Sequence, residues 1–392
     1  MGGSDITEIL ERYYRVKGEH VDYVIKAIRE LYGKAVKTIG KNQIRIMHVC
    51  GTHEHTVTAY GLRSLVPEGL NLIAGPGCPV CVTPGKAIDD ISKLAIEGAV
   101  IVYTYGDVYK LPGIKLSLAK AKSLGGDVRV VYSFLDALKD AKKHSRESIF
   151  VGVGFETTAP SVASPLLKGR VPKNLKIASL YRLTAPGLNE ALKAHVKSKT
   201  PIDGVIPPGH VSTIIGAKAW SYLSEVYKIP AVVAGFEPLD YLIALAEILK
   251  QLCLNESKLV NEYSRVARWE GNVNAWNTVM KVFNVVDAYW RGIGVLKDSG
   301  LELKDEYLVY DACKEYGIST RPSQDMPRGC KCAEITLGLA VPTDCPHFMR
   351  GCLPDKPIGP CMVSIEGTCS VWARFGGGGL ADEIAKELGL KP

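Results

Sequence analysis

Short apolar runs alternate with longer amphipathic stretches along most of this chain. Residues 5–40 interleave apolar positions with charges, which predicts helix. From residue 44 onwards, runs rich in Val, Ile and Tyr predict eight strands separated by helix-length segments. These runs begin at Ile44, Leu70, Ala99, Val128, Ser148, Leu175, Gly204 and Ala231. Such alternation is typical of β-α-β units around a parallel sheet, so we expect an α/β fold.

The strand pattern restarts near residue 148, which predicts two similar open-sheet α/β domains at residues 43–146 and 147–250. Their openings correspond, because I46-M-H-V-C-G-T-H-E-H-T and F150-V-G-V-G-F-E-T-T-A-P both read as strand, glycine turn and helix start. Beyond these domains, residues 241–250 and roughly 255–290 indicate helix. A tail rich in Gly, Pro and Cys follows, and its lack of periodicity suggests that bound metal orders it.

The net charge of +7 is unevenly distributed. Residues 115–199 hold 16 Lys/Arg against 6 Asp/Glu, a net +10. Such a surface can serve an acidic partner or a phosphate-bearing ligand, or it can be solvated helix surface. No basic block is dense or interleaved with aromatics, so we expect no nucleic-acid binding. The first twenty residues lack a secretory signal, and no apolar run approaches the roughly 18 residues that span a bilayer, so we expect a soluble cytoplasmic protein.

Eleven cysteines are the strongest compositional signal. In a reducing compartment, clustered cysteines indicate metal or redox chemistry more often than structural disulfides. Four thiolates hold zinc or an iron–sulfur cluster, but zinc sites usually bring paired C-x2-4-C knuckles, which the tail lacks. We therefore predict an iron–sulfur cluster there, with zinc and disulfides as the alternatives, and two thiols left over for a redox pair. The six tail cysteines are Cys330, Cys332, Cys345, Cys352, Cys361 and Cys369.

Two further thiol motifs follow predicted strands. Cys78 and Cys81 form a C-x-x-C in G75-P-G-C-P-V-C81, which is typical of redox dithiols but also of half a zinc site or an inert pair. Cys50 opens C50-G-T-H-E-H-T56 and could be a nucleophile paired with His53, a metal ligand or a buried core residue. Ligands of open α/β sheets bind at the carboxyl ends of the strands, so we expect both motifs at one edge if their strands are neighbours. Cys253 and Cys313 stand apart and are expected to be small buried hydrophobes.

Three glycine-containing segments also follow predicted strands: GFETTAP at 154–160, PPGHVSTIIG at 207–216 and GFEPLD at 235–240. Backbone amides at such turns can cradle an anion or a partner's tail. Glu156, His210 and Glu237 are their candidate polar groups, although helix capping explains the threonines of the first segment equally well.

In this order, and with the six-cysteine tail, these motifs resemble the HypD family of hydrogenase maturation proteins over essentially the whole chain. The resemblance implies a scaffold that assembles the Fe(CN)2CO unit of [NiFe]-hydrogenases in complex with the small chaperone HypC. It also implies that HypE delivers cyanide, which it carries as a thiocyanate on a C-terminal cysteine. The implied architecture adds to the two α/β domains a third, formed by residues 1–42 and 251–392, that holds a [4Fe-4S] cluster.

The resemblance also implies residue roles. Cys50 matches a cysteine that holds iron together with a HypC cysteine, and His53 is a ligand or supporting residue, with His55 the weaker candidate. Cys78 and Cys81 match a redox dithiol. The tail is similar to that of ferredoxin:thioredoxin reductase, which implies a cluster held by four cysteines beside a redox pair, Cys332 and Cys361. The four expected cluster ligands are Cys330, Cys345, Cys352 and Cys369.

Two other functions compete with this interpretation. A stand-alone thiol oxidoreductase resembling ferredoxin:thioredoxin reductase accounts for eight cysteines, but it leaves Cys50 and His53 without a role. A zinc-stabilised interaction module accounts for the tail alone. Whether the scaffold is itself an enzyme stays open at this point. We expect a monomer that enters transient complexes with its partners.

Overall fold

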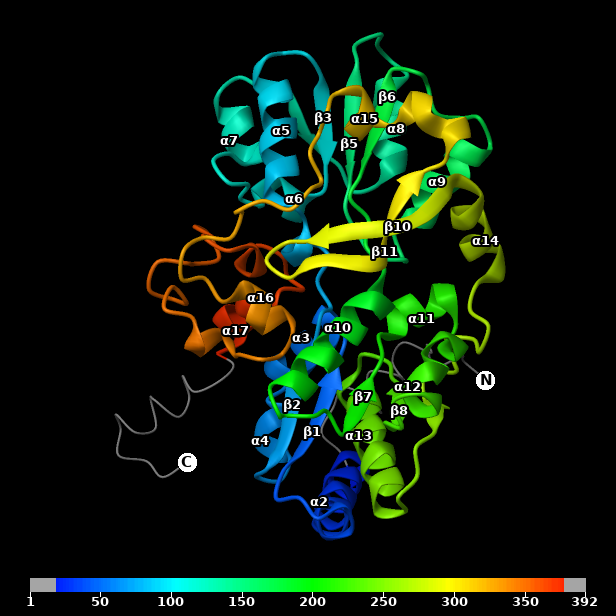
Figure 1. Ribbon diagram of the computed structural model, residues 1–392, viewed down its shortest axis with the longest axis vertical. Coiled ribbons are helices and arrows are strands. Elements are labelled where there is room, and N and C mark those ends of the chain that lie inside the picture. Colours follow the sequence, from blue (N-terminus) through cyan, green and yellow to red (C-terminus); the bar gives the residue numbers. More distant parts are fainter. Residues whose placement is uncertain (1–18, 377–392) are drawn as a thin grey trace, which may run out of the picture. The chain divides into compact units, whose positions relative to one another are not determined.

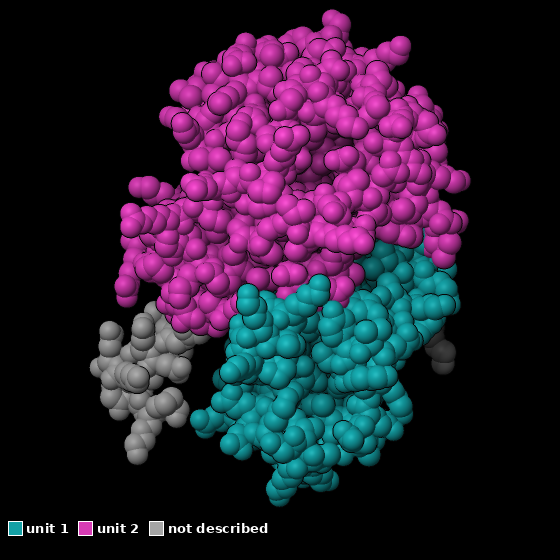
Figure 2. Space-filling model, in the orientation of Figure 1, with its two compact units in different colours: residues 1–77, 191–272, 374–392 teal, residues 78–190, 273–373 magenta. Residues whose placement is uncertain are grey.

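The computed structural model describes residues 19–376, which separate into two compact units (Figures 1 and 2). Unit 1 contains residues 1–77, 191–272 and 374–392, and unit 2 contains residues 78–190 and 273–373. The described part of the chain forms one five-stranded sheet, one four-stranded sheet and one two-stranded sheet. No helix within it is long and apolar enough to cross a membrane.

Unit 1 is built on the five-stranded parallel sheet, in the order β2-β1-β7-β8-β9. Its strands are β1 (Ile44–His48), β2 (Leu70–Ala74), β7 (Gly204–Ile206), β8 (Ala231–Val233) and β9 (Leu259–Asn261). Its helices are α2 (Glu19–Ile39), α3 (Gly51–Ala59), α4 (Leu62–Leu65), α11 (Gly209–Ile215), η3 (Ala217–Trp220), α12 (Ser221–Glu225) and α13 (Pro238–Cys253). α2 packs against α13, and both bury apolar side chains with Ile44 and Ile46 of β1.

Unit 2 is built on the four-stranded parallel sheet, in the order β4-β3-β5-β6. Its strands are β3 (Ile101–Thr104), β4 (Val128–Val130), β5 (Ser148–Gly152) and β6 (Leu175–Ser179). Its helices are η2 (Val80–Val82), α5 (Gly85–Ile96), α6 (Gly106–Lys110), α7 (Leu118–Ser123), α8 (Phe134–Ala141), α9 (Ala159–Leu167) and α14 (Val273–Val282). α10 (Thr184–Lys197) spans the boundary between the units.

Both faces of the unit 2 sheet are covered by helices. Val102 of β3 packs in one buried cluster with α5 and α7, whereas its neighbours Ile101 and Tyr103 pack in another with α8 and α9. Side chains of a strand alternate between faces, so a sheet covered on both sides needs apolar residues at every position. This requirement explains the apolar run at residues 101–103 of β3.

The eight predicted strands are confirmed as β1 to β8. The predicted helix at residues 5–40 is α2 from Glu19 onwards, and residues 5–18 lie outside the described part of the chain. The helix predicted over residues 255–290 is wrong except at α14. β9 precedes α14, and β10 (Phe283–Trp290) follows it and pairs antiparallel with β11 (Gly294–Leu303). The apolar positions of residues 276–286 suit a helical repeat. However, the chain reverses at Gly292 and Gly294, which both have positive φ, so the β-branched and aromatic residues of β10 pair with β11 as a hairpin.

The sheets group the strands differently from the expected segments 43–146 and 147–250. Each of those segments contributes two strands to each large sheet. α2 and the Cys-rich region, which were expected to share a third domain, belong to different units. Sequential strands are neighbours in only about two-thirds of cases, so strand identity alone does not determine which strands pair.

The region after the β10–β11 hairpin is built from short helices joined by loops, seen in orange and red in Figure 1. They are η4 (Asp305–Tyr310), α15 (Ala312–Glu315), α16 (Cys332–Thr336), η5 (Pro342–Asp344), η6 (Pro360–Met362) and α17 (Thr368–Phe375). This part of unit 2 carries all six tail cysteines.

Candidate functional site

Cys50 lies at the carboxyl edge of the unit 1 sheet. It follows β1 with an extended backbone (φ −161°, ψ 134°), directly precedes α3 and is 9% exposed. β1 and β2 are parallel neighbours, so the loop after β2 reaches the same edge. There the Gly51 N–H donates to the Gly77 carbonyl (3.3 Å), and a Cβ on Gly77 would lie 2.5 Å from the Cys50 Cα. The expectation that Cys50 and the C-x-x-C motif follow neighbouring strands is confirmed, and the chain enters unit 2 at Cys78.

His53, one turn into α3, is fully buried. Its Nε2–H donates to the Gly235 carbonyl (2.8 Å), and its ring stacks on Phe236 with centroids 4.7 Å apart. Burial, assisted by His48, lowers the pKa of His53 to about 3. The ring is therefore neutral at physiological pH, and its Nδ1 has no hydrogen-bond partner. A neutral imidazole whose other nitrogen is held by a carbonyl is the form that binds metals.

A buried polar network fastens α3 to the sheet. His48 of β1 accepts from the Tyr241 hydroxyl at Nδ1 and donates to Glu54 at Nε2, both at 2.8 Å. The Glu54 carboxylate also accepts from Thr58 Oγ1 (2.9 Å) and Arg63 Nη2 (2.7 Å). Burial works against ionisation of Glu54, but Arg63 and His48 outweigh it and hold its pKa below the ordinary value. The network thus keeps a carboxylate charged in the core and orients α3, the helix that carries His53 and directly follows Cys50.

Two of the three glycine segments lie at the same edge of unit 1. The Phe236 ring stacks with two imidazoles, with ring centroids 3.9 Å apart for His210 and 4.7 Å apart for His53. Glu237 caps the N-terminus of α13 through a reciprocal arrangement with Asp240. His55 is half-buried and meets Phe375 edge to face at 4.7 Å.

The third segment, GFETTAP, belongs to unit 2. Burial raises the pKa of Glu156, whose carboxyl accepts from the Thr184 N–H (2.8 Å) and hydroxyl (2.7 Å). This contact secures the start of α10, so Glu156 has a structural role.

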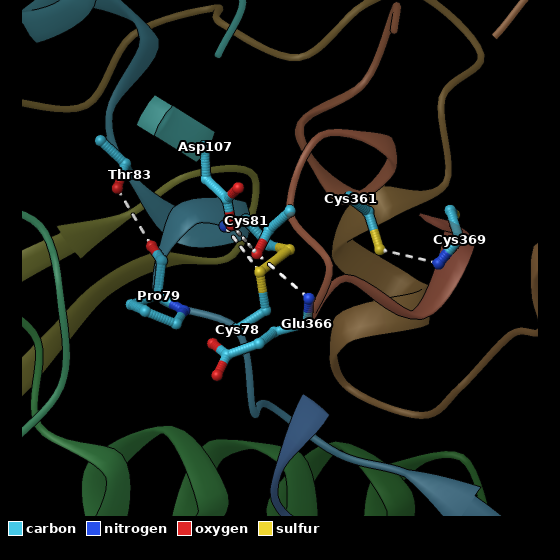
Figure 3. Close-up of a disulfide and its surroundings, with 9 residues drawn as sticks. Cys78, Pro79, Cys81, Thr83, Asp107, Cys361, Glu366 and Cys369 are labelled. Atoms are coloured by element: carbon cyan, nitrogen blue, oxygen red, sulfur yellow. Dashed lines mark hydrogen bonds between the residues drawn. A yellow bond between two sulfur atoms is a disulfide. The ribbon is translucent and has the colours of Figure 1, made fainter. Parts of the chain in front are cut away.

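Cys78 and Cys81 form a disulfide at the start of unit 2 (Figure 3). Both are at least 95% buried, and the Cys81 N–H donates to the Cys78 Sγ (3.2 Å). The turn η2 that contains Cys81 contacts η6, which contains Cys361. The disulfide therefore packs into the same buried cluster as most of the tail cysteines.

An acidic pair lies in the surroundings of this disulfide (Figure 3). Ser364 connects them, because its hydroxyl donates to Asp107 Oδ2 (2.7 Å) and accepts from the Glu366 N–H (3.1 Å). Burial and the charge of Asp107 raise the pKa of Glu366 to about 7. Glu366 can thus gain or lose a proton near neutral pH. The sequence interpretation missed both acids, because each is isolated among ordinary residues.

The six tail cysteines lie together as free thiols. The Sγ atoms of Cys330 and Cys332 are 3.2 Å apart, and Cys330 also contacts Cys345. Hydrogen bonds from the Cys332 and Cys369 thiols lower the pKa of Cys361. Cys332 thus touches more than one other thiol, and the division into cluster ligands and redox pair stays a prediction.

Backbone groups of the Cys-rich region contact its thiols or lie close to them. Cys352 Sγ accepts from the Ile358 N–H (3.3 Å) and the Gly359 N–H (3.5 Å), as sulfurs that ligate iron commonly do. A Cβ on Gly359 would lie 2.7 Å from both Cys330 Sγ and Cys332 Sγ, so only glycine leaves these thiols room. Within residues 19–376, no three Cys, His, Asp or Glu side chains are already arranged around one metal position.

Comparison with known proteins agrees with these motifs. The family model described as "HypD: Hydrogenase formation hypA family" matches residues 20–376. The chain belongs to the HypD family of hydrogenase maturation factors. It is 44% identical over 355 residues to a putative hydrogenase expression/formation protein of Methanocaldococcus jannaschii, covering 88% of this chain and 98% of that protein. It is 38% identical over 361 residues to the hydrogenase maturation factor HypD of Escherichia coli, covering 91% and 95%. It is also 38% identical over 338 residues to HypD of Cupriavidus necator, covering 84% and 89%.

The family match includes every predicted site residue, from Cys50 to Cys369. Sequence reasoning found the thiols and His53 but missed the network of His48, Glu54 and Arg63. His48 could have indicated this network, because a histidine at the end of the otherwise apolar, buried part of the strand I44-R-I-M-H48 needs a hydrogen-bond partner.

Proposed function

We propose that this chain is a scaffold and redox protein for the Fe(CN)2CO unit of [NiFe]-hydrogenases, acting in complex with HypC and receiving cyanide from HypE. The observation that carries this proposal is that the Cys78–Cys81 disulfide packs into the same buried cluster as the tail thiols. A reversible dithiol inside a cysteine-rich core is what a cyanide-accepting scaffold needs, because releasing cyanide from a thiocyanate consumes two electrons.

Iron is the substrate of this scaffold, and Cys50 is its proposed ligand. Low-spin iron(II) that bears cyanide and CO suits a soft thiolate donor. His53 supports this role, because its Nδ1 has a free lone pair and stays unprotonated at physiological pH. It either ligates the iron or accepts a hydrogen bond from a group on it. A HypC cysteine supplies the second thiolate.

The proposed transfer step balances when Cys78 and Cys81 start as a dithiol. The HypE thiocyanate carries an S–C≡N group, and its S–C bond breaks. The dithiol loses two electrons and two protons and becomes a disulfide. One proton restores the HypE thiol, the other leaves the site, and the cyanide anion binds iron. The Cys78–Cys81 disulfide is the oxidised end of this step.

The proposed cofactor of the tail is a [4Fe-4S] cluster held by Cys330, Cys345, Cys352 and Cys369. When bound, such a cluster supplies single electrons at low potential. The chain's own contribution is the thiol pair Cys332 and Cys361, and the backbone N–H groups that donate to Cys352. A brown anaerobic preparation with iron and acid-labile sulfide is expected, and zinc without sulfide would overturn this assignment.

The test of the scaffold compares Cys50→Ala with Cys253→Ala after co-expression with HypC. Cys253 is a matched control because it is a partly buried free thiol of the same unit, far along the chain from the motif. We expect Cys50→Ala to lose the infrared bands of bound CN and CO while it keeps tail iron and sulfide, and Cys253→Ala to keep both. Normal bands in Cys50→Ala would show that Cys50 is not the ligand.

The competing function is a stand-alone thiol oxidoreductase, which the Cys78–Cys81 disulfide also favours. It predicts no CN or CO bands in the wild-type complex with HypC. It also predicts that Cys50→Ala reduces disulfides as fast as the wild type and that Cys78→Ser does not.

A further inference from the structure

The acidic pair Asp107 and Glu366 lies beside the disulfide of unit 2. In the view of Figure 3, the Cys78–Cys81 disulfide lies between the labelled side chains of the two acids. The turn η2, which contains Cys81, contacts η6, and the chain continues from η6 through Ser364 to Glu366. All of these residues belong to unit 2. The two acids are therefore part of the surroundings in which the disulfide opens and closes.

A hydrogen-bonded bridge joins the two acids. The Ser364 hydroxyl donates to Asp107 Oδ2 (2.7 Å) and accepts from the backbone N–H of Glu366 (3.1 Å). Burial and the charge of Asp107 raise the pKa of Glu366 to about 7. Among residues 19–376, Asp107 is the one charged side chain that shifts this pKa, and the sulfurs of a disulfide do not titrate. Ser364 is buried, but both acids are partly exposed, so they can exchange protons with solvent.

Cys78 is the sulfur of the pair that is better suited to become a thiolate. The Cys81 N–H donates to the Cys78 Sγ (3.2 Å), and a hydrogen bond to a titrating group favours its charged form when that form is the acceptor. A cysteine with an ordinary pKa of about 8.5 is mostly protonated at neutral pH, so a dithiol must lose protons as it is oxidised. A general base works best when its own pKa lies near the operating pH. Glu366 meets this condition.

We propose that Glu366 accepts the proton of the Cys78 thiol when the dithiol is oxidised, and returns a proton to Cys78 when the disulfide is reduced. This inference rests on the proposed function, in which the dithiol gives two electrons to the HypE thiocyanate. The S–C bond breaks, the Cys78–Cys81 bond forms and two thiol protons are released. One proton restores the HypE thiol, and the Glu366 carboxylate takes the other and passes it to solvent. Asp107 is a positioning residue that acts through Glu366, because its charge raises the proton affinity of that carboxylate.

The test follows reduction of this disulfide by dithiothreitol in the full-length protein alone, from about pH 6 to about pH 8. Trypsin releases residues 64–86, a peptide whose only cysteines are Cys78 and Cys81, so alkylation and mass spectrometry report this disulfide specifically. Dividing each rate by the rate for oxidised glutathione cancels the titration of dithiothreitol itself. With a pKa of about 7, about nine-tenths of Glu366 is protonated at pH 6 and about one-tenth at pH 8, so the wild-type ratio should fall about tenfold.

Three variants separate proton donation from other effects of the charge. Glu366→Gln cannot donate a proton, so at about pH 6 it should be at least about tenfold slower than the wild type, and its ratio should be nearly independent of pH. If the Glu366 charge only repelled the attacking thiolate, this variant would instead match the wild type at that pH. Asp107→Asn keeps the donor but removes the charge that raises its pKa, so the fall should begin at lower pH. Glu97→Gln changes an exposed carboxylate of unit 2 and, as the control, should reproduce the wild-type profile.

A wild-type ratio that stays constant over this pH range would overturn the proposal, and so would a Glu366→Gln variant as fast as the wild type at the acidic end. An unshifted profile in Asp107→Asn would overturn the part assigned to Asp107. These measurements need no HypC, HypE or added iron, so their failure is distinct from failure of the proposed scaffold, which the CN and CO bands of Cys50→Ala test.

Discussion

Glu54→Gln tests whether the buried network holds α3 in place. The Glu54 carboxylate is 1% exposed and accepts from His48, Thr58 and Arg63 at 2.7–2.9 Å. A glutamine at this position offers one accepting oxygen and turns an NH2 donor toward groups that already donate. Removing one member of a fully buried charged pair costs about 3–5 kcal/mol. The Arg63 side chain is 28% exposed and regains some hydration, so we expect a loss of about 2–4 kcal/mol in the free energy of unfolding.

The assay combines urea unfolding with hydrogen exchange of residues 51–59. Exchange is needed because a chain of two units does not have to unfold in one step. Glu247→Gln is the control: Glu247 pairs with Lys250 (3.0 Å), whose side chain is 57% exposed, and its loss should cost less than about 0.5 kcal/mol. In Glu54→Gln the amides of α3 should exchange faster, whereas those of the unit 2 sheet should not change.

The pH dependence gives an independent check. Arg63 and His48 hold the pKa of Glu54 below its ordinary value, so the stabilisation is present above that ordinary value and is lost as the pH falls through the folded-state pKa. The difference between wild type and Glu54→Gln should therefore shrink between about pH 7 and about pH 3. A difference below about 0.5 kcal/mol at neutral pH, or one that is the same at both pH values, would refute the reasoning.

Three further predictions follow from single positions. Gly77→Ala should lower the free energy of unfolding by at least about 2 kcal/mol, because its Cβ would lie 2.5 Å from the Cys50 Cα. The same variant should lose the infrared bands of bound CN and CO. An unchanged free energy of unfolding in urea would contradict this prediction. Gly33→Ala in α2, which has open space around it, should instead stabilise by about 0.5–1 kcal/mol in the same assay. Glu366, whose pKa is raised to about 7, favours the protonated folded state, so stability should fall by up to about 3 kcal/mol as the pH rises from about 4.5 through 7. Glu366→Gln should flatten that profile, and an unchanged slope in urea titrations would refute the assignment.

Strands were predictable because each is a short, local run of β-branched and aromatic residues. Their pairing was not, because β1 pairs with β7, more than 150 residues later in the chain, and no local feature of either strand records this. The hairpin β10–β11 was missed for a different reason. The apolar spacing of residues 276–286 satisfies a helical period, and only Gly292 and Gly294, both with positive φ, mark the reversal that makes a hairpin possible.

The thiol motifs were predictable because cysteine, glycine and proline at short spacings are informative by themselves. The polar groups that contact these motifs, and the contacts that shift pKa values near them, were not predictable from the sequence. His48 meets Tyr241, and His53 meets Gly235, across more than 180 residues. Likewise, Glu366 depends on Asp107 for its raised pKa, and neither residue is unusual in its own segment. Functional residues that lie within one short motif can be predicted from the sequence. Residues whose pKa depends on burial and on partners distant in the chain can be identified only from the folded structure.

The motif G75-P-G-C-P-V-C81 combines two structural requirements in one short segment, close packing in unit 1 and a disulfide in unit 2. Its first half belongs to unit 1, where a Cβ on Gly75 would lie 2.8 Å from Met47 Sδ and one on Gly77 would lie against Cys50. Its second half belongs to unit 2, where Cys78 and Cys81 form the disulfide packed among the tail thiols. Close packing therefore requires the glycines, the disulfide requires the cysteines, and one peptide bond separates Gly77 from Cys78. A substitution in the first half should impair iron binding before it changes the reactivity of the disulfide, and a substitution of either cysteine should do the reverse.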